Sequence, residues 1–360
     1  MKQKRILVTE GADRSLFSFT QNQIEIIANT LLSKINSIEN PGLLEGRTGV
    51  SLFFLNYYKL TGNRKYRDSA IAIIESVSIN LELLRENFGF SNGLSGISWY
   101  IEYMAKRGFI ENDTNEILEK VCLQLNGVDF CGISDLSLSK GLIGNGMHFL
   151  ARLSNPNFLA QKELHLKEKN ISFILVDLLT EHLYGIKEEG RKNVYEENCI
   201  AEIILFLCQL QKLQVYSEIL DTVLRDYVNC CRKFSFYKKS TLYTAYALYQ
   251  ASKALHDKEL EELSINMALK RIEDKDKANR ETGILIGEMW RAHLYNLFYQ
   301  QTAIETFKTA ALFWTNKILS VKIIQSEMDI SITSGLAGMG LVLISIVADF
   351  KPDWDGCLLL

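Results

Sequence analysis

Cysteine and histidine side chains are the first candidates for chemistry, because thiolates and imidazoles are common nucleophiles and zinc ligands. The chain has seven cysteines and five histidines, and no two cysteines have C-x-x-C spacing. This pattern argues against a disulfide framework and against a ribbon-type zinc site. Cys230 and Cys231 are adjacent, so on a helix they point about 100° apart and do not readily ligate one ion. We expect free thiols in a reducing compartment.

Carboxylates near the starts of apolar segments are a second set of candidates, because a pair of them can act as acid and base in a glycosidase-like hydrolase. Five acidic residues have this placement: Glu45, Asp135, Glu202, Glu281 and Glu288. The helix dipole alone also favours acidic residues there, which leaves solvated side chains as the alternative. His148 and His293 lie close to such starts too, either facing a channel or hydrogen-bonded in the core.

A cationic stretch is the third candidate. Lys238 and Lys239 follow Arg232 and Lys233 closely, just before an apolar segment. Four positive charges in one place suit a carboxylate or an acidic peptide, and the alternative is a solvated loop.

The elements that position these residues are marked by a repeated glycine pair. G-x-x-G stands at 46–49, 93–96, 141–144 and 335–338, and degraded copies begin at Cys199, Ser240 and Gly287. The starts recur about every 48 residues, which is room for two helices and two connections. Segments after the pairs are apolar nearly all round, whereas those before them are amphipathic. The sequence predicts seven helical hairpins, each with an outer amphipathic helix and an inner apolar helix.

The outer helices are expected at 21–36, 66–85, 115–125, 168–179, 217–234, 259–272 and 304–319. Only three prolines interrupt the chain, so an all-α class is predicted. An open array of hairpins would need polar terminal repeats, and neither the first nor the last repeat is polar. We therefore predict a closed α/α toroid, with the first repeat touching the seventh and the glycine segments at one end.

The composition and charge of the chain limit its possible partners further. The chain has 360 residues, 47% of them hydrophobic, and a net charge of −3, which gives no basic surface for nucleic acid. No apolar run follows the basic start, and the longest, at about 335–348, is shorter than the roughly 20 residues that cross a bilayer. We expect one domain over residues 1–360, in the cytoplasm, without membrane insertion or a nucleic-acid partner.

On these motifs the chain resembles the LanC-like family, the lanthionine synthetase C cyclases. The four intact G-x-x-G pairs are similar to the family's repeated signature, and the ending SGLAGMGLVLISIVADFKPDWDGCLLL is similar to that of its bacterial members. The resemblance implies an α/α toroid of seven inner and seven outer helices. It also implies addition of a precursor-peptide cysteine to dehydroalanine or dehydrobutyrine, with the thiol activated by zinc.

The family's zinc ligands are two cysteines and a histidine, and the resemblance places them on three positions here. The matching residues are Lys238 in the fifth repeat and Leu285 and Ile286 in the sixth. An ammonium group and two hydrocarbon side chains supply no soft sulfur or imidazole donor. Zinc is therefore expected to be absent, and no cofactor replaces it.

Supporting positions of the family have changed as well. Its histidine in the fourth repeat matches Asn198 and its tyrosine after the first cysteine matches Lys239. Its acidic residue in the third repeat matches Ser137, with Asp135 two residues away, and its arginine matches Phe234. We expect a zinc-free pseudoenzyme that binds a precursor peptide or a dehydratase-like partner. The residues expected to make this contact are Asp135, Asn198, Lys238, Lys239, Glu288 and His293.

A zinc-independent enzyme in the same cavity is the alternative. It would close thioether rings on a dehydrated peptide, or act as a carboxylate-based, glycosidase-like hydrolase.

Overall fold

The computed structural model describes residues 12–360, apart from 80, 85, 86, 112, 156–161, 190–193, 215, 234–240, 274–286 and 321–328. The described residues form fourteen α-helices and a few short 3₁₀ helices, with no strand among them. The predicted all-α class is confirmed.

Inner and outer helices alternate along the chain as predicted. The inner helices are α2 (Arg47–Thr61), α4 (Leu94–Lys106), α6 (Leu142–Leu153), α9 (Val194–Lys212), α11 (Leu242–Leu255), α13 (Glu288–Thr302) and α15 (Leu336–Val347). The outer helices are α1 (Ala12–Lys34), α3 (Arg64–Ile79), α5 (Thr114–Leu125), α8 (Lys162–Glu189), α10 (Ser217–Lys233), α12 (Lys258–Glu273) and α14 (Glu305–Leu319). All twelve residues of α6 are buried, whereas α3 buries five of its sixteen, because only one stripe of an amphipathic helix meets the core.

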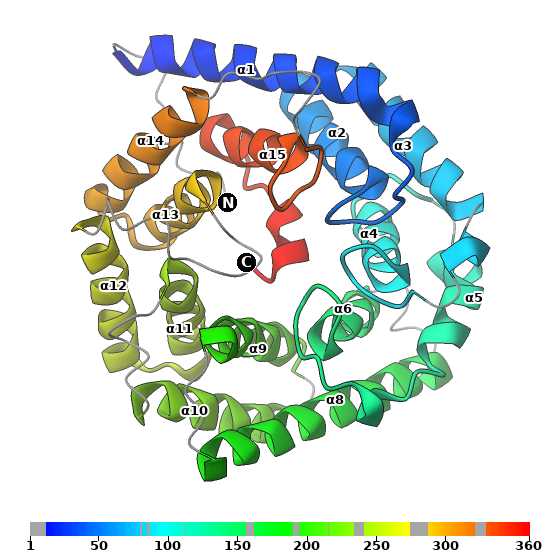
Figure 1. Ribbon diagram of the computed structural model, residues 1–360, viewed down its shortest axis with the longest axis vertical. Coiled ribbons are helices and arrows are strands. Elements are labelled where there is room, and N and C mark those ends of the chain that lie inside the picture. Colours follow the sequence, from blue (N-terminus) through cyan, green and yellow to red (C-terminus); the bar gives the residue numbers. More distant parts are fainter. Residues whose placement is uncertain are drawn as a thin grey trace. The chain divides into compact units, whose positions relative to one another are not determined.

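The chain divides into two compact units, Met1–Asn80 with Ile272–Gly356, and Leu81–Arg271 with Cys357–Leu360. In the first unit α15 packs against α2 and α13, α1 packs on α15, and α3 and α14 cover α2 and α13 (Figure 1). In the second unit α6 packs between α4 and α9, and α11 packs on the other side of α9 (Figure 1). The packing of α15 on α2 confirms the predicted contact between the seventh repeat and the first.

The loop before each intact glycine pair has the same hydrogen bonds in all four repeats. The residue six positions before the first glycine is Asn40, Asn87, Asp135 or Asp329. Its side-chain Oδ1 accepts the N–H group two residues later, at 2.8, 3.2, 2.8 and 3.1 Å respectively. Its carbonyl oxygen accepts the first N–H of the following helix, at 2.8 to 2.9 Å. The loop thus folds back on the start of its own inner helix.

Both glycines of the pair are required by the space that this loop leaves. A Cβ atom on Gly46, Gly93 or Gly141 would collide with the carbonyl oxygen of the Asn or Asp residue. A Cβ atom on the second glycine would collide with the carbonyl oxygen six residues upstream, as at Gly144 and Gly338. The glycines therefore allow close backbone approach, as the repeat pattern predicted.

Neighbouring loops are joined to one another by backbone hydrogen bonds. In the first unit the N–H of Ile332, in the seventh-repeat loop, donates to the carbonyl of Leu44 in the first-repeat loop at 2.7 Å. In the second unit the N–H groups of Phe90 and Ser91 donate to the carbonyl of Ser139 at 3.0 and 2.9 Å. Within each unit, therefore, the glycine segments of adjacent repeats lie side by side, as predicted.

Several boundaries differ from the sequence-based ranges. Helix α1 begins at Ala12 instead of 21, and α3 ends at Ile79 instead of 85. Helix α8 extends over 28 residues, because Glu, Lys and Leu favour helix beyond the amphipathic stripe that marked the core. Helix α9 begins at Val194, well before the degraded motif at Cys199. The fourth repeat lacks the glycine pair, and its motif lies inside the helix.

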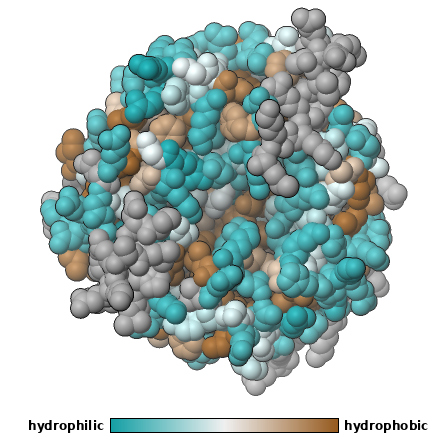
Figure 2. Space-filling view, turned by 180° about the vertical axis from the view of Figure 1, so that it is seen from behind, coloured by the Kyte–Doolittle hydropathy of each residue, from teal (hydrophilic) through white to brown (hydrophobic). Residues whose placement is uncertain are grey.

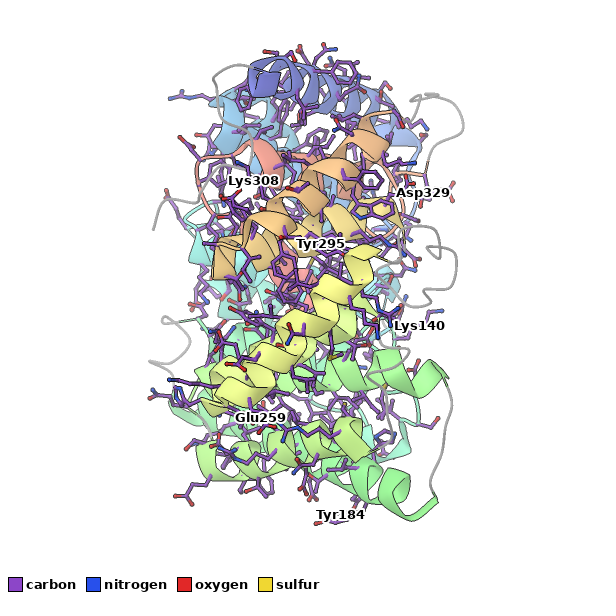
Figure 3. The ribbon with its side chains drawn as sticks, turned by 90° about the vertical axis from the view of Figure 1, so that its left-hand side faces the viewer. Lys140, Tyr184, Glu259, Tyr295, Lys308 and Asp329 are labelled. Atoms are coloured by element: carbon purple, nitrogen blue, oxygen red, sulfur yellow. The ribbon has the colours of Figure 1, made fainter. Side chains whose placement is uncertain are left out.

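The outward sides of the outer helices carry polar residues together with some exposed hydrophobic ones, such as Ile79 and Leu123. Figure 3 shows Glu259 on α12 and Lys308 on α14, whereas Tyr295 of α13 packs against Phe307 of α14 with ring centroids 6.1 Å apart. The face shown in Figure 2 is mainly hydrophilic, with hydrophobic residues scattered over it. None of the helices in the described ranges combines the length and hydropathy that a membrane span requires.

Alanine at Gly338 tests the glycine argument. Its Cβ would meet the carbonyl of Ile332, so we expect Gly338→Ala to lower the free energy of unfolding by about 3 kcal/mol. The matched control is Gly185→Ala in α8, where no atom lies within 4 Å of the new Cβ. That variant should gain about 0.5 kcal/mol, because alanine restricts the unfolded chain. Equal urea-unfolding midpoints for the two variants would contradict the argument.

Candidate functional site

The structure describes the surroundings of the predicted site more fully than the site itself. Lys238, Lys239, Leu285 and Ile286 lie outside the described residues. Asn198 lies in α9, and its side chain is outside the description as well. The described part of the site consists of the first turns of the inner helices and the loops before them.

Asp135 and Glu288 are both exposed. The carboxylate of Asp135 accepts the N–H of Ser137 at 2.8 Å, which is the loop hydrogen bond that Asn40, Asn87 and Asp329 also make. Glu288 is the first residue of α13, where the helix dipole favours a negative charge. The contact of either residue with a peptide stays a prediction.

Glu202 stands where the fourth repeat would have its second glycine, and its side chain is buried. Its Oε2 accepts the N–H of Leu138, in the third-repeat loop, at 2.7 Å. Leu138 is equivalent to Ile332 and Phe90, whose N–H groups donate to a carbonyl of the neighbouring loop. In the fourth repeat the preceding residues are helical, so the carboxylate of Glu202 takes the place of that loop carbonyl.

Burial determines the protonation of Glu202. Loss of solvation raises its pKa from 4.5 to about 7, the Leu138 N–H opposes this shift, and the charge of Asp135 adds to it. The carboxyl group is therefore close to half protonated at neutral pH. It holds this proton with only 6% of the residue exposed to solvent.

Tyr243 replaces the second glycine of the fifth repeat and is also buried. Burial and the nearby charge of Glu202 raise the pKa of its phenol well above the usual value, so the group stays neutral. Its hydroxyl has no hydrogen-bond partner among the described residues. The fourth and fifth repeats thus bring a carboxyl and a phenol into each other's electrostatic range.

Trp290 replaces the second glycine of the sixth repeat. Its Nε1 donates to the carbonyl of Thr333 at 2.8 Å, and its ring lies 6.2 Å from that of Trp354. In each of the three degraded repeats a large buried side chain thus occupies the position at which the intact repeats have their second glycine. From the sequence these three positions were interpreted only as missing glycines. The packing of their side chains between neighbouring repeats was not predicted.

His293 lies one turn beyond Trp290 and is buried. Its Nε2 is 3.1 Å from Oδ2 of Asp355, and its ring centroid is 4.8 Å from that of Trp354. Its Nδ1 has no hydrogen-bond partner among the described residues. The C-terminal segment therefore packs on this histidine, and its predicted role in binding stays untested.

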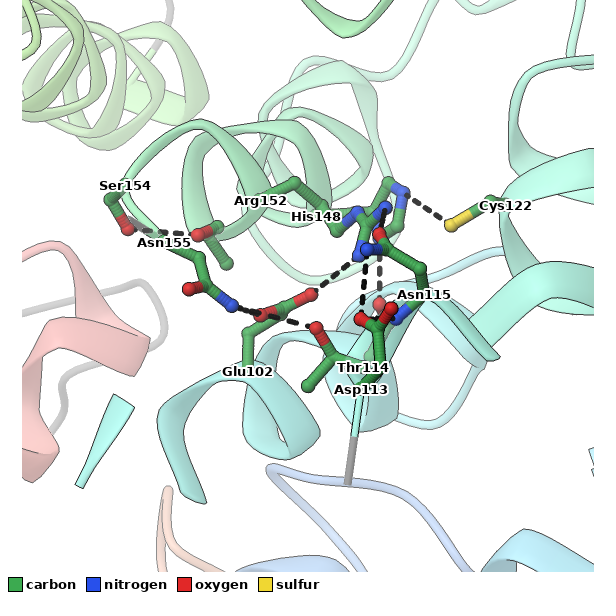
Figure 4. Close-up of polar contacts among 11 residues, drawn as sticks. Glu102, Asp113, Thr114, Asn115, Cys122, His148, Arg152, Ser154 and Asn155 are labelled. Atoms are coloured by element: carbon green, nitrogen blue, oxygen red, sulfur yellow. Dashed lines mark hydrogen bonds and ion pairs between the residues drawn. The ribbon is translucent and has the colours of Figure 1, made fainter. Parts of the chain in front are cut away.

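His148 is fully buried and belongs to a different cluster, between α4, α5 and α6 (Figure 4). Its Nδ1 is 2.7 Å from the Ser98 hydroxyl and its Nε2 is 4.0 Å from Sγ of Cys122. Burial first, and the charge of Arg152 second, lower its pKa to about 3. A neutral imidazole cannot form the imidazolium partner that would stabilise a Cys122 thiolate, so this trio is not an activated nucleophile.

A buried ion pair lies beside this cluster (Figure 4). Arg152 Nη1 donates to Glu102 Oε1 at 2.7 Å, and Arg152 Nη2 donates to Asn115 Oδ1 at 2.7 Å. Glu102 and Arg152 are 50 residues apart, as are Ser98 and His148, so each pair joins nearly equivalent positions of consecutive repeats. A search for complementary polar residues one repeat apart would have found both pairs. Breaking such a pair is destabilising, which makes it a structural contact.

Over the part of the chain that the structure describes, no three His, Cys, Asp or Glu side chains are grouped to hold a metal ion. The family resemblance places the expected zinc site on positions 238, 285 and 286, which carry Lys, Leu and Ile. This donor set does not fit zinc, because it offers neither thiolate nor imidazole.

Comparison with known proteins agrees with the geometry. Residues 37–155, which span the first three glycine pairs, match the family model described as lanthionine synthetase C-like protein. The solved structure of nisin cyclase superposes with a TM-score of 0.69 at 16% identity, over 94% of this chain and 96% of that chain. At this identity the likeness concerns the fold, and it confirms the predicted α/α toroid class. No curated protein sequence matches the chain.

The raised pKa of Glu202 makes a prediction about stability. The native carboxyl binds its proton up to about pH 7 and the unfolded one only to about 4.5, so the native state holds more protons between these values. The stabilisation is therefore complete below pH 4.5 and is lost as pH rises through 7. We expect the unfolding free energy of the wild type to fall, relative to Glu202→Gln, by about 3 kcal/mol between about pH 4 and pH 8.

Glutamine keeps an oxygen acceptor for the Leu138 N–H but does not titrate, which makes it the matched variant. Denaturant unfolding across this pH range measures the difference. A pH-independent difference between the two proteins would show that Glu202 titrates normally.

Proposed function

We propose that the chain is a LanC-like protein that binds a dehydrated, cysteine-containing precursor peptide without the family's zinc chemistry. LanC-like cyclases act on such peptides, which supports a peptide as the ligand. The zinc-free part of this proposal rests on the residues at the family's ligand positions, which are Lys238, Leu285 and Ile286. A dehydratase-like protein that presents the peptide is a partner of the same system.

The changes in the neighbouring repeats support this proposal. Glu202, Tyr243 and Trp290 are buried at the degraded motifs of the fourth, fifth and sixth repeats, which in the family carry the histidine and the zinc ligands. In the first, third and seventh repeats the second glycine has no room for a side chain. The differences from the family pattern are therefore concentrated where its chemistry would occur.

The peptide's thiol would receive little activation without the metal. A free thiol has a pKa near 8.5, so only a few per cent is ionised at neutral pH. We propose that Lys238 and Lys239 instead contact an acidic stretch of the peptide through screened electrostatics. Asp135, Asn198, Glu288 and His293 complete the proposed contact surface.

One synthetic probe tests binding and chemistry together: a fluorescent peptide with a dehydroalanine, a cysteine and an acidic stretch. We expect saturable binding that weakens with salt, metal content well below one zinc per chain, and ring formation no faster than in solution. The Lys238→Ser/Lys239→Ser variant should bind about fivefold more weakly and with less salt dependence. Anisotropy, elemental analysis and mass spectrometry give the three readouts.

The triple variant Lys238→Cys, Leu285→Cys, Ile286→His is the sharper test of the ligand positions. It should bind about one zinc, whereas Lys238→Cys alone should not, because zinc needs three protein ligands around an open position. Stoichiometric zinc in the wild type would refute the donor-set argument. Ring closure by the metal-free wild type would show the zinc-independent enzyme instead, and absence of peptide binding would refute the proposed ligand.

A further inference from the structure

A polar crevice lies on the first compact unit, between α1 and the C-terminal end of α2. Its volume is about 470 Å³. Helix α1 lines it with one stripe of its surface, at helical spacing: Ser18, Gln21, Asn22 and Glu25. The last turns of α2 supply the other wall through Tyr57 and Thr61. The inner-helix starts described above are at the other end of α2, about 20 Å along the helix.

The lining residues have the chemistry of a cation site. They include one carboxylate, Glu25, together with amide and hydroxyl oxygens, and no Lys, Arg or His side chain. Glu25 is exposed to solvent, so a ligand can reach its charge without first opening the fold. The crevice also lies at the C-terminal end of α2, where the helix dipole favours positive charge.

One aromatic ring, that of Tyr57, lines the crevice beside the carboxylate, and Tyr66 packs against it from outside the lining. The rings of Tyr57 and Tyr66 have centroids 4.5 Å apart at an interplanar angle of 59°, and both side chains are 6% exposed. Burial first, then Tyr66 and Glu25, raise the pKa of Tyr57 to about 12, so its ring carries no charge of its own. The negative face of a neutral aromatic ring attracts a cation, and a carboxylate beside it adds a direct ionic partner.

The chain already places one ammonium group near these rings. Nζ of Lys65 lies 6.0 Å from the centroid of Tyr66, at the outer limit of a cation–π contact. Lys65 is not among the residues that line the crevice, so the lining offers the charge of Glu25 to a second cation. The amide oxygens of Gln21 and Asn22 lie on the same helical stripe as Glu25 and can accept the remaining N–H groups of such a ligand.

We propose that this crevice binds the alkylammonium group of a peptide, with Glu25 as its counter-ion and the Tyr57 ring as its apolar and cation–π contact. The group is supplied by a lysine side chain or by a free amino terminus. The site is distinct from the zinc-free peptide contact proposed above, and neither proposal requires the other.

Three short peptides distinguish the sources of the ammonium group. Acetyl-Ala-Lys-Ala-amide presents only a lysine ammonium, Ala-Ala-Ala-amide presents only an amino terminus, and acetyl-Ala-norleucine-Ala-amide presents neither. We expect the norleucine peptide to bind at least fivefold more weakly than the better of the two charged peptides. The better charged peptide should also bind more weakly as ionic strength rises. Shifts of tyrosine ring resonances by NMR report occupancy of the crevice directly.

Glu25→Gln is the test variant and Glu75→Gln, an exposed residue of α3 outside the crevice, is its matched control. Loss of the Glu25 charge should weaken binding of the charged peptide about fivefold, whereas the control variant should bind this peptide as the wild type does. Tyr57→Phe keeps the ring and should retain binding. Equal affinity for charged and norleucine peptides, or equal affinity of the two glutamine variants, would overturn the proposal, as would the absence of any saturable shift.

Discussion

The arrangement of the described inner helices depends on backbone hydrogen bonds between neighbouring glycine loops. In each bond a peptide N–H group of one loop donates to a carbonyl oxygen of the next loop. Ile332 donates to Leu44 in the first compact unit, and Phe90 and Ser91 donate to Ser139 in the second. These bonds form only when the loop lies flat against the start of its own helix. That position in turn requires glycine, because a Cβ atom would occupy the space of a backbone carbonyl. The repeated glycines are thus required both for the turn within each repeat and for the hydrogen bonds between neighbouring repeats.

The fourth repeat shows what happens when this loop is missing. Its helix begins early, at Val194, so the described residues that precede Glu202 are helical and offer no loop carbonyl to the N–H of Leu138. An unsatisfied buried N–H would be costly, and the carboxylate of Glu202 accepts it at 2.7 Å. The substitution has an electrostatic consequence, because a buried carboxylate is poorly solvated and holds its proton to about pH 7. The side chain that replaces the loop carbonyl is therefore also a group that titrates near neutral pH.

Much of the fold could be predicted from the sequence, because glycine spacing and hydrophobic periodicity are local signals. The alternation of apolar and amphipathic helices and the contact of the seventh repeat with the first both followed from them. The extent of α8 did not, since its polar ends carry helix propensity without periodicity. The Asn or Asp residue six positions before each glycine pair can also be read from the sequence, but the glycine pattern alone does not indicate the hydrogen bonds that it makes.

The candidate site was less accessible to sequence reasoning. Positions 238, 285 and 286 could be assigned only through the family resemblance, since lysine, leucine and isoleucine carry no signal of a site in themselves. The buried roles of Glu202 and Tyr243 depend on the neighbouring repeat, which a linear pattern does not reveal. The crevice at Glu25 arises from two helices meeting at their ends, and no motif marks it.

Amide hydrogen exchange of the loop N–H groups tests the central claim most directly. If the contacts between loops hold the described inner helices in place, the amides of Phe90, Leu138 and Ile332 should exchange only through global unfolding. The amide of Asn63, in the exposed turn after α2, should exchange by local opening and much faster. Exchange of the three loop amides at the rate of Asn63 would contradict the account.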